Sequence, residues 1–187
     1  MKHEITSYNT RRLLADALKS AMATKPFSKI TVSEIIRRTG VNRKTFYYHF
    51  EDIYALMKWM FEEEAVQVVK NFDLLVDYEQ AIGFVMDYAE TNDALIRSVC
   101  DSVGREELKG FFYADFVSVI ESALVTAEQR RGINMDPEFR AYVAGFYSEA
   151  LAGMLLDWVR NKKTRDREKT VRYLKTILES GLSALVS

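Results

Sequence analysis

A short run near the N-terminus gathers side chains that donate hydrogen bonds. Residues 43–49 are, in order, Arg, Lys, Thr, Phe, Tyr, Tyr and His. Guanidinium, ammonium, hydroxyl and imidazole groups donate to phosphate oxygens and to the acceptors on base edges. Bond-making chemistry would need a nucleophile paired with a base, or a cluster of metal ligands, near these residues. The composition of the run therefore favours recognition of nucleic acid over catalysis.

Two predicted helices position this run. Residues 31–34, Thr-Val-Ser-Glu, have the form of a capping box, in which the threonine hydroxyl meets the backbone N–H three residues on and the glutamate reaches back. Gly40 suits the left-handed conformation that closes a helix. Asn42 is a good cap for a second, short helix, in which Phe46 and Phe50 are expected to face the core.

A helix, a tight turn and a second helix form a helix-turn-helix, whose second helix enters the major groove of DNA. The side chains of the second helix that do not face the core can then reach base edges, and the start of the first helix lies near the phosphate backbone. The candidate DNA-contacting residues are Thr31, Ser33, Arg43, Lys44, Thr45, Tyr47, Tyr48 and His49.

The charge of the chain differs between its N-terminal part and the rest. Residues 1–50 hold ten lysines and arginines against three acids, a net charge of +7, whereas the rest holds 16 bases and 24 acids, a net charge of −8. Clustered cations displace the counterions condensed on DNA, which is the main source of affinity for it. A basic DNA-binding module is therefore predicted to precede an acidic one.

Other classes of function have little support in the sequence. His3 and His49 are the only histidines, Cys100 is the only cysteine, and no glycine-rich phosphate loop occurs. The acidic clusters at residues 62–64 and 106–107 are interpreted as solvated helix faces rather than metal ligands. We therefore predict no enzyme activity, no metal site and no cofactor.

The whole chain is predicted to be helical. Only two prolines and eight glycines interrupt it, and apolar residues recur at three- and four-residue spacing. The expected helices cover residues 10–23, 31–39, 42–50, 52–70, 79–91, 93–100, 105–130, 137–161 and 166–185. We predict a three-helix DNA-binding domain over residues 1–51 and a helical effector-binding and dimerisation domain over residues 52–187. Because no run of 18 apolar residues and no signal peptide occur, a cytoplasmic protein without membrane contact is expected.

The segments Thr31–Ile36 and Thr39–Phe50 resemble the DNA-binding domain of the TetR family of bacterial transcriptional regulators. The resemblance extends from about residue 10 to residue 60, and residues 42–59 are most similar to a branch that includes regulators of dihydroxyacetone kinase genes. It implies that Arg43, Lys44, Thr45 and Tyr47 approach bases or nearby backbone, and that Thr31, Tyr48 and His49 contact phosphates. Ile53 stands where most members of the family carry a phosphate-binding lysine.

The resemblance also implies an effector site in the C-terminal helices. Aromatic and methionine side chains there can form an apolar wall, with tyrosine hydroxyls to orient a ligand. The candidate ligand-binding residues are Phe84, Tyr88, Phe112, Phe116, Tyr147 and Met154. Three alternatives stay open: a small-molecule effector, a domain that senses a protein partner instead, and a helical adaptor that does not bind DNA itself.

Residues 137–161 and 166–185 are the candidates for a homodimer interface. The first of these helices carries two apolar stripes, one through Val143, Phe146, Ala150 and Met154 and another through Tyr147, Leu151, Leu155 and Trp158. One core needs a narrower apolar arc, so the second stripe is expected to face another chain. Members of the resembled family usually pair through a four-helix bundle here, and a twofold dimer implies a palindromic operator.

Overall fold

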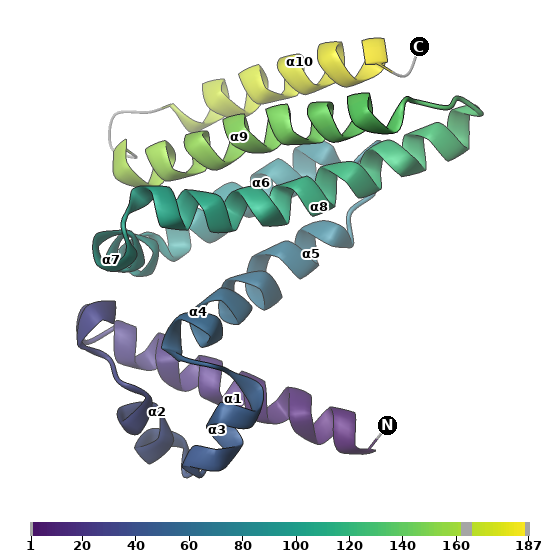
Figure 1. The fold of residues 1–187 in the computed structure, drawn as a ribbon. Helices are drawn as coiled ribbons and strands as arrows, with labels where there is room; N and C mark the ends of the chain where they lie inside the picture. Colours follow the sequence, from purple (N-terminus) through teal and green to yellow (C-terminus); the bar gives the residue numbers. More distant parts are fainter. Residues whose placement is uncertain (1, 162–165, 186–187) are drawn as a thin grey trace. The chain divides into compact units, whose positions relative to one another are not determined.

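The computed structural model describes residues 2–161 and 166–185, and these residues form helices and connecting turns without any strand (Figure 1). This confirms the predicted all-helical fold. The chain divides into two compact units. The N-terminal unit comprises Met1–Glu64 and Ala94–Gly104, and the C-terminal unit comprises Ala65–Asp93 and Arg105–Ser187.

The N-terminal unit contains the predicted helix-turn-helix. Its elements are α1 (Lys2–Met22), the 3₁₀ turn η1 (Phe27–Lys29), α2 (Val32–Thr39), α3 (Arg43–His49), α4 (Ile53–Phe61) and α7 (Asp93–Val103). α1 packs against both α2 and α4. The core consists of large side chains that are almost completely buried, among them Leu14, Leu18, Phe27, Ile35, Phe46, Leu56, Met60 and Phe61.

The first helix begins at Lys2 rather than at Thr10. The Thr10 hydroxyl donates to the carbonyl of Thr6 at 2.9 Å, one turn earlier, so this side chain lies inside the helix instead of capping it. A threonine can act in either way, because its hydroxyl can bond a backbone N–H at a helix start or a carbonyl four residues back.

The predicted helix over residues 52–70 consists of three consecutive segments. α4 is followed by a π-helical turn, η2 (Glu62–Val66), and then by α5 (Gln67–Lys70). The compact units divide after Glu64, within the π-helical turn, whereas the sequence suggested a boundary after residue 51. The difference arises because α4 packs against α1, and because Lys19 on α1 forms an ion pair with Glu64 at 2.6 Å.

α7 belongs to the N-terminal unit although it is far from it in sequence. The backbone N–H of Phe27 donates to Ser98 Oγ at 2.8 Å, and that of Ser28 donates to Ser102 Oγ at 3.1 Å. These two bonds fix the turn η1, which precedes the helix-turn-helix. The chain therefore passes between the units after Glu64, after Asp93 and after Gly104.

The C-terminal unit is a bundle of long helices. α5 and α6 (Tyr78–Thr91) precede α8 (Arg105–Arg131), α9 (Pro137–Asn161) and α10 (Arg167–Leu185). α8 and α9 form an antiparallel hairpin, and α6 packs against both α9 and α10 (Figure 1). Within the described residues, α8 alone has the length and apolar content of a membrane span, a composition it shares with core helices of soluble proteins.

The α8–α9 turn is held by a buried carboxylate. Glu128 accepts a hydrogen bond from the backbone N–H of Met135 at 2.6 Å and one from Arg140 Nη1, also at 2.6 Å. These two donors, the backbone N–H first, lower the pKa of Glu128 against the opposing effect of burial. The ionised carboxylate thereby fixes the register of the two longest helices of the unit.

Gly181 on α10 lies against the side chain of Tyr147 on α9. A Cβ atom at this position would overlap the hydroxyl of Tyr147, whereas one at Gly110 on α8 would meet no described atom within 4 Å. The absence of a side chain at Gly181 therefore allows Tyr147 to lie under α10.

We predict that Gly181→Ala destabilises the protein by about 1–3 kcal/mol through overpacking, measured by urea unfolding. Gly110→Ala, the matched control, should stabilise it by about 0.5–1 kcal/mol because alanine favours an exposed helix. Tyr147→Phe removes the overlapping oxygen, so adding it to Gly181→Ala should recover part of the loss. Equal effects of Gly181→Ala with and without Tyr147→Phe would contradict the contact.

Candidate nucleic-acid interface and effector cavity

Caps at both ends of the turn determine where α3 begins and how it is oriented. Thr31 Oγ1 accepts from the Glu34 N–H at 3.3 Å at the start of α2, and Gly40 closes α2 with a φ of 72°. Asn42 Oδ1 accepts from the Thr45 N–H at 2.8 Å and so starts α3. The Asn42 side chain accepts from a backbone N–H of the first helical turn, which has no acceptor inside the helix.

Burial of one face of α3 exposes the other. Phe46 is 0% exposed and Phe50 is 5% exposed, as the sequence predicted, so both anchor the helix in the core. Tyr48, between them in sequence, is 72% exposed. Because successive residues of a helix are rotated by about 100°, fixing the phenylalanines directs the polar residues of α3 outwards.

The eight candidate DNA-contacting residues all lie on α3 or at the start of α2. Thr45 and His49 are half-buried, and the other six are exposed. The guanidinium of Arg43 lies over the ring of Tyr47, 5.6 Å from its centre, and an edge of the His49 ring meets Tyr48. Contacts of this kind restrict the freedom of long side chains before any ligand arrives.

Glu34 is a buried acid among the basic residues of this unit. Its carboxylate pairs with Lys25 and accepts hydrogen bonds from Arg38 Nε at 3.1 Å and Nη2 at 3.0 Å. The bond from Lys25, followed by that from Arg38, lowers the pKa of Glu34 although burial acts in the opposite direction. The side chain thus joins α2 to the loop that follows α1 instead of reaching back to Thr31, as the capping-box pattern had suggested.

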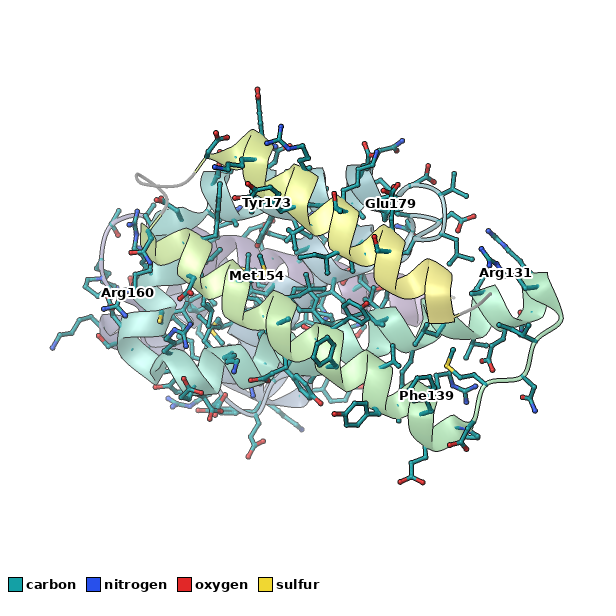
Figure 2. The ribbon with its side chains drawn as sticks, turned by 90° about the horizontal axis from the view of Figure 1, so that it is seen from above. Arg131, Phe139, Met154, Arg160, Tyr173 and Glu179 are labelled. Carbon is teal, nitrogen blue, oxygen red and sulfur yellow. The ribbon has the colours of Figure 1, made fainter. Side chains whose placement is uncertain are left out.

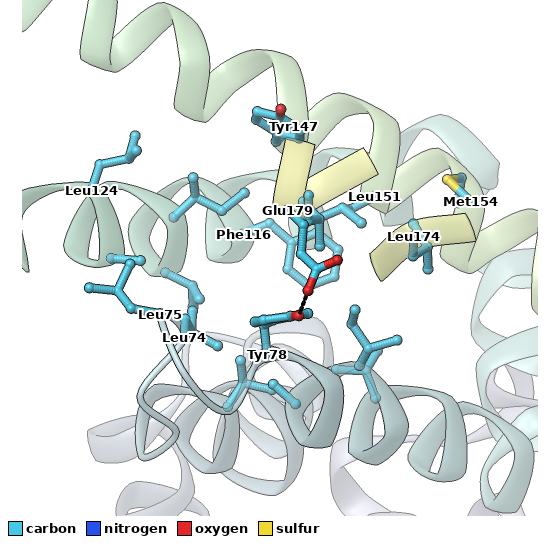
Figure 3. A pocket seen from close by; sticks show the side chains of 18 of the residues that line it. Leu74, Leu75, Tyr78, Phe116, Leu124, Tyr147, Leu151, Met154, Leu174 and Glu179 are labelled. Carbon is cyan, nitrogen blue, oxygen red and sulfur yellow. Dashed lines mark hydrogen bonds between the residues drawn. The ribbon is translucent and has the colours of Figure 1, made fainter. Parts of the chain in front are cut away.

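A cavity of about 430 Å³ lies inside the C-terminal unit. Its walls come from α6, α8, α9 and α10, and it is closed towards α5 by Val69, Leu74 and Leu75. Figure 3 shows Tyr78 of α6, Tyr147 and Met154 of α9, and Leu174 of α10 around it. A cavity of this size is typical of sites for small organic ligands.

The cavity contains half of the predicted ligand-binding residues. Phe116, Tyr147 and Met154 line it, whereas Phe84, Tyr88 and Phe112 do not. The centre of the Phe84 ring lies 6.3 Å from that of Phe72 and 6.4 Å from that of Tyr88, and Phe84 packs against a buried cluster that includes Ala81 and Val119. Phe112 is buried and its ring stacks on that of Phe116, which lines the cavity. Phe84, Tyr88 and Phe112 thus pack against other aromatic rings, and none of them lines the cavity.

Polar groups are few along the cavity. The Tyr78 hydroxyl donates to Glu179 and links α6 to α10 (Figure 3), and this bond to a carboxylate raises the pKa of Tyr78. Lys175 pairs with Glu79, and Arg167 pairs with Asp87 at 2.6 Å, so further ion pairs join the same two helices. The indole N–H of Trp158 is buried without an acceptor among the described residues.

Comparison with known proteins places both units in one family. Residues 14–59 match the family model of bacterial regulatory proteins of the tetR family, and residues 77–180 match that of a transcriptional regulator C-terminal region. The chain belongs to the TetR family. It is a transcriptional regulator with an N-terminal DNA-binding region and a C-terminal regulatory region.

Two of the similar proteins carry the name DhaS. The sequence is 17% identical over 145 residues to the HTH-type dhaKLM operon transcriptional activator DhaS of Lactococcus lactis subsp. lactis (strain IL1403), covering 78% of this chain and 76% of that protein. A solved structure described as the dihydroxyacetone kinase operon activator DhaS matches with a TM-score of 0.69 at 17% identity. It covers 95% of this chain and 98% of that one, and it supports the TetR fold.

Several residues of this TetR regulator that matter for its sites were not identified from the sequence. Ser98 and Ser102 hold the turn η1, and Tyr78, Glu179 and the indole of Trp158 are among the polar groups that line the cavity. Ser98 and Ser102 lie within α7, about 70 residues after η1, and their local sequence does not indicate that they will contact that turn. The spacing of apolar residues can indicate which face of a helix is buried. It does not indicate which neighbouring helix that face will contact.

We predict that Glu34→Gln lowers the melting temperature of this regulator at neutral pH, because Lys25 and Arg38 lose their charged partner. A lowered pKa means that the charge of Glu34 stabilises the fold above its ordinary pKa of 4.5 and that this contribution is lost as the pH falls through the lower, folded value. The difference between wild type and variant should therefore shrink below pH 4.5. Calorimetry with Glu51→Gln as an exposed control tests this, and a difference that grows on acidification would refute it.

Proposed function

We propose that this TetR regulator binds a palindromic operator in double-stranded DNA as a homodimer, with α3 in the major groove, and that an effector in its C-terminal unit controls this binding. One observation carries the proposal: α3 is capped at Asn42 and anchored by Phe46, while Arg43, Lys44, Tyr47 and Tyr48 are exposed on it. A short helix held this rigidly, with cations in its first turn, is suited to reading DNA.

The exposed side chains divide into two roles. Arg43 and Lys44 can pair with guanine acceptors in the major groove, Arg43 by two parallel bonds, and Thr45 and Tyr47 add hydroxyls near them. Thr31, Ser33, Tyr48 and His49 are proposed to contact phosphates on either side, which fixes position without reading sequence. In this proposal residues 1–51 bind DNA and residues 52–187 regulate that binding. The helical stretch of residues 52–70 connects the two functions.

We infer that the protein acts without catalysis, metal or cofactor, in the cytoplasm and away from the membrane. In the parts of the chain that the structure describes, no three His, Cys, Asp or Glu side chains are grouped to hold a metal ion. Its role as a regulator rests on binding, for which the capped helix and the cavity are sufficient.

The homodimer is proposed to form through the outer surfaces of α9 and α10. Tyr142 and Phe146 on α9 are 72% and 63% exposed, and Phe139, Tyr173 and Ile177 are also exposed. Figure 2 labels Phe139 and Tyr173 on these two helices, which lie side by side. Exposed aromatic side chains gathered on neighbouring helices are typical of interaction surfaces.

This surface differs from the one that the sequence suggested. The stripe of Tyr147, Leu151, Leu155 and Trp158, expected to face another chain, lines the cavity instead. One side of the wide apolar arc of α9 therefore lines the internal cavity. Phe146 lies on the other side, which is exposed.

The cavity favours a small-molecule effector over a protein partner as the controlling signal. Apolar space of about 430 Å³ between helices is suited to enclosing a ligand. A ligand that binds one arrangement of the bundle more tightly shifts the population towards it, and DNA affinity changes by the same factor as ligand affinity.

We predict distinct effects for two substitutions on α3, measured on duplexes selected from a random library by the wild type. Tyr48→Ala should weaken all duplexes alike and reduce the salt dependence of binding, as loss of a phosphate contact does. Arg43→Ala should cost about 1–3 kcal/mol and also relax the preference at one base pair. Tyr48→Phe separates the hydroxyl from the ring. Unchanged binding by every variant would favour an adaptor that does not read DNA.

We predict that Tyr142→Glu combined with Phe146→Glu converts the protein to a monomer in light scattering and abolishes binding to the full palindrome, because buried unpaired carboxylates are costly. The control is Val76→Glu, at a side chain 68% exposed outside α9 and α10, which should stay dimeric. The half-sites should be about 34–36 Å apart or a multiple of this. A monomeric wild type at micromolar concentration with a non-palindromic site would contradict the proposal.

A further inference from the structure

The cavity of the C-terminal unit is elongated. Its lining residues extend from Phe116 to Arg131 on α8 and from Tyr147 to Trp158 on α9. At about 1.5 Å per residue these stretches measure about 22 Å and about 16 Å. A ligand that fills the cavity must therefore be long and narrow rather than compact.

The cavity walls are almost entirely hydrocarbon or aromatic. Side chains from four helices contribute, among them Ala81, Ile82, Val85, Met86, Phe116, Val119, Ile120, Ala123, Leu151, Met154, Leu155, Leu174 and Leu178. Such walls offer no hydrogen bonds along most of the length. A ligand with several hydroxyl groups would lose its bonds to water there without replacement.

The charged residues that line the cavity are Arg130, Arg131 and Glu179, so both signs of charge are present. Arg130 pairs with Asp73 at 2.7 Å, and Glu179 accepts from Tyr78 and lies 4.0 Å from Lys175. Because Arg130 and Glu179 each already face an opposite charge, neither offers an unpaired charge to a ligand. An ion placed in the apolar stretch would lose hydration without gaining a counter-charge.

The cavity wall also holds one buried donor, the indole N–H of Trp158. Trp158 lines the cavity, is 4% exposed, and its Nε1–H has no acceptor within the described residues. Buried indole N–H groups usually find one, because an unmet buried donor is costly.

We propose that the cavity binds a neutral, elongated, mostly apolar molecule whose carbonyl or ether oxygen accepts a hydrogen bond from Trp158 Nε1–H. This rests on the proposed function in that the molecule is the effector, and it defines the effector's chemistry. A compact, doubly hydroxylated molecule such as dihydroxyacetone does not meet these requirements.

The test compares molecules of one chain length by calorimetry with the full protein. Methyl heptyl ketone should bind at least about tenfold more tightly than nonanoate or nonylammonium. Its neutral carbonyl can accept from Trp158 Nε1–H, and it requires no opposite charge in the cavity wall. Dihydroxyacetone should give no signal. No ketone binding at a Kd below about 1 mM, or equal binding of the charged analogues, would overturn the proposal.

Two substitutions locate the binding. Trp158→Phe should weaken the ketone about tenfold, as loss of one buried hydrogen bond does, and an unchanged affinity would refute the assigned donor. Ala123→Phe should fill the cavity and abolish binding, with Ala123→Leu as a milder variant, whereas Ala114→Phe on the exposed side of the same helix should leave it unchanged. Loss of binding in Ala114→Phe would place the ketone elsewhere.

Operator affinity measured with and without saturating ketone separates this inference from the proposed function. Binding that leaves operator affinity unchanged supports the ligand class and argues against the effector role. A shift in operator affinity that disappears in Ala123→Phe supports both.

Discussion

Burial of Phe46 against the core of the N-terminal unit is the contact on which the DNA-binding surface depends. A helix of seven residues is too short to be stable alone, so α3 exists because its apolar side is packed and its ends are capped. The same packing decides which side chains face solvent. The polar residues of α3, two of which are themselves half-buried, are thus positioned mainly by the burial of Phe46 and Phe50, and a cavity beneath Phe46 would disturb them all.

The N-terminal unit was predictable from sequence to the extent that its signals are local. The caps at Thr31 and Asn42, the turn at Gly40 and the inward phenylalanines follow from spacing within a few residues, and the structure has each of them. The start of α1 was not predictable in this way, because the hydroxyl of Thr10 serves a cap or a helix interior equally well.

The C-terminal unit was predictable as helices but only partly as a site. Apolar spacing located the long helices, yet it did not indicate that Phe84 and Tyr88 would stack on each other while Tyr147 and Trp158 turned towards a cavity. That choice depends on which helices become neighbours and on one glycine, Gly181, that admits the Tyr147 ring. Contacts between distant segments, such as the Ser98 and Phe27 bond, leave no trace in local sequence.

α10 has two working faces on a single helix. Thr170, Leu174 and Leu178 form part of the cavity wall, while Tyr173 and Ile177 point to solvent. If a molecule bound inside changed the position of α10, it would change the affinity of the outer face for a second chain, and dimerisation would change the affinity for the molecule by the same factor. The response to an effector would then vary with the abundance of the regulator itself, and a cell could set its sensitivity through the amount of protein that it makes.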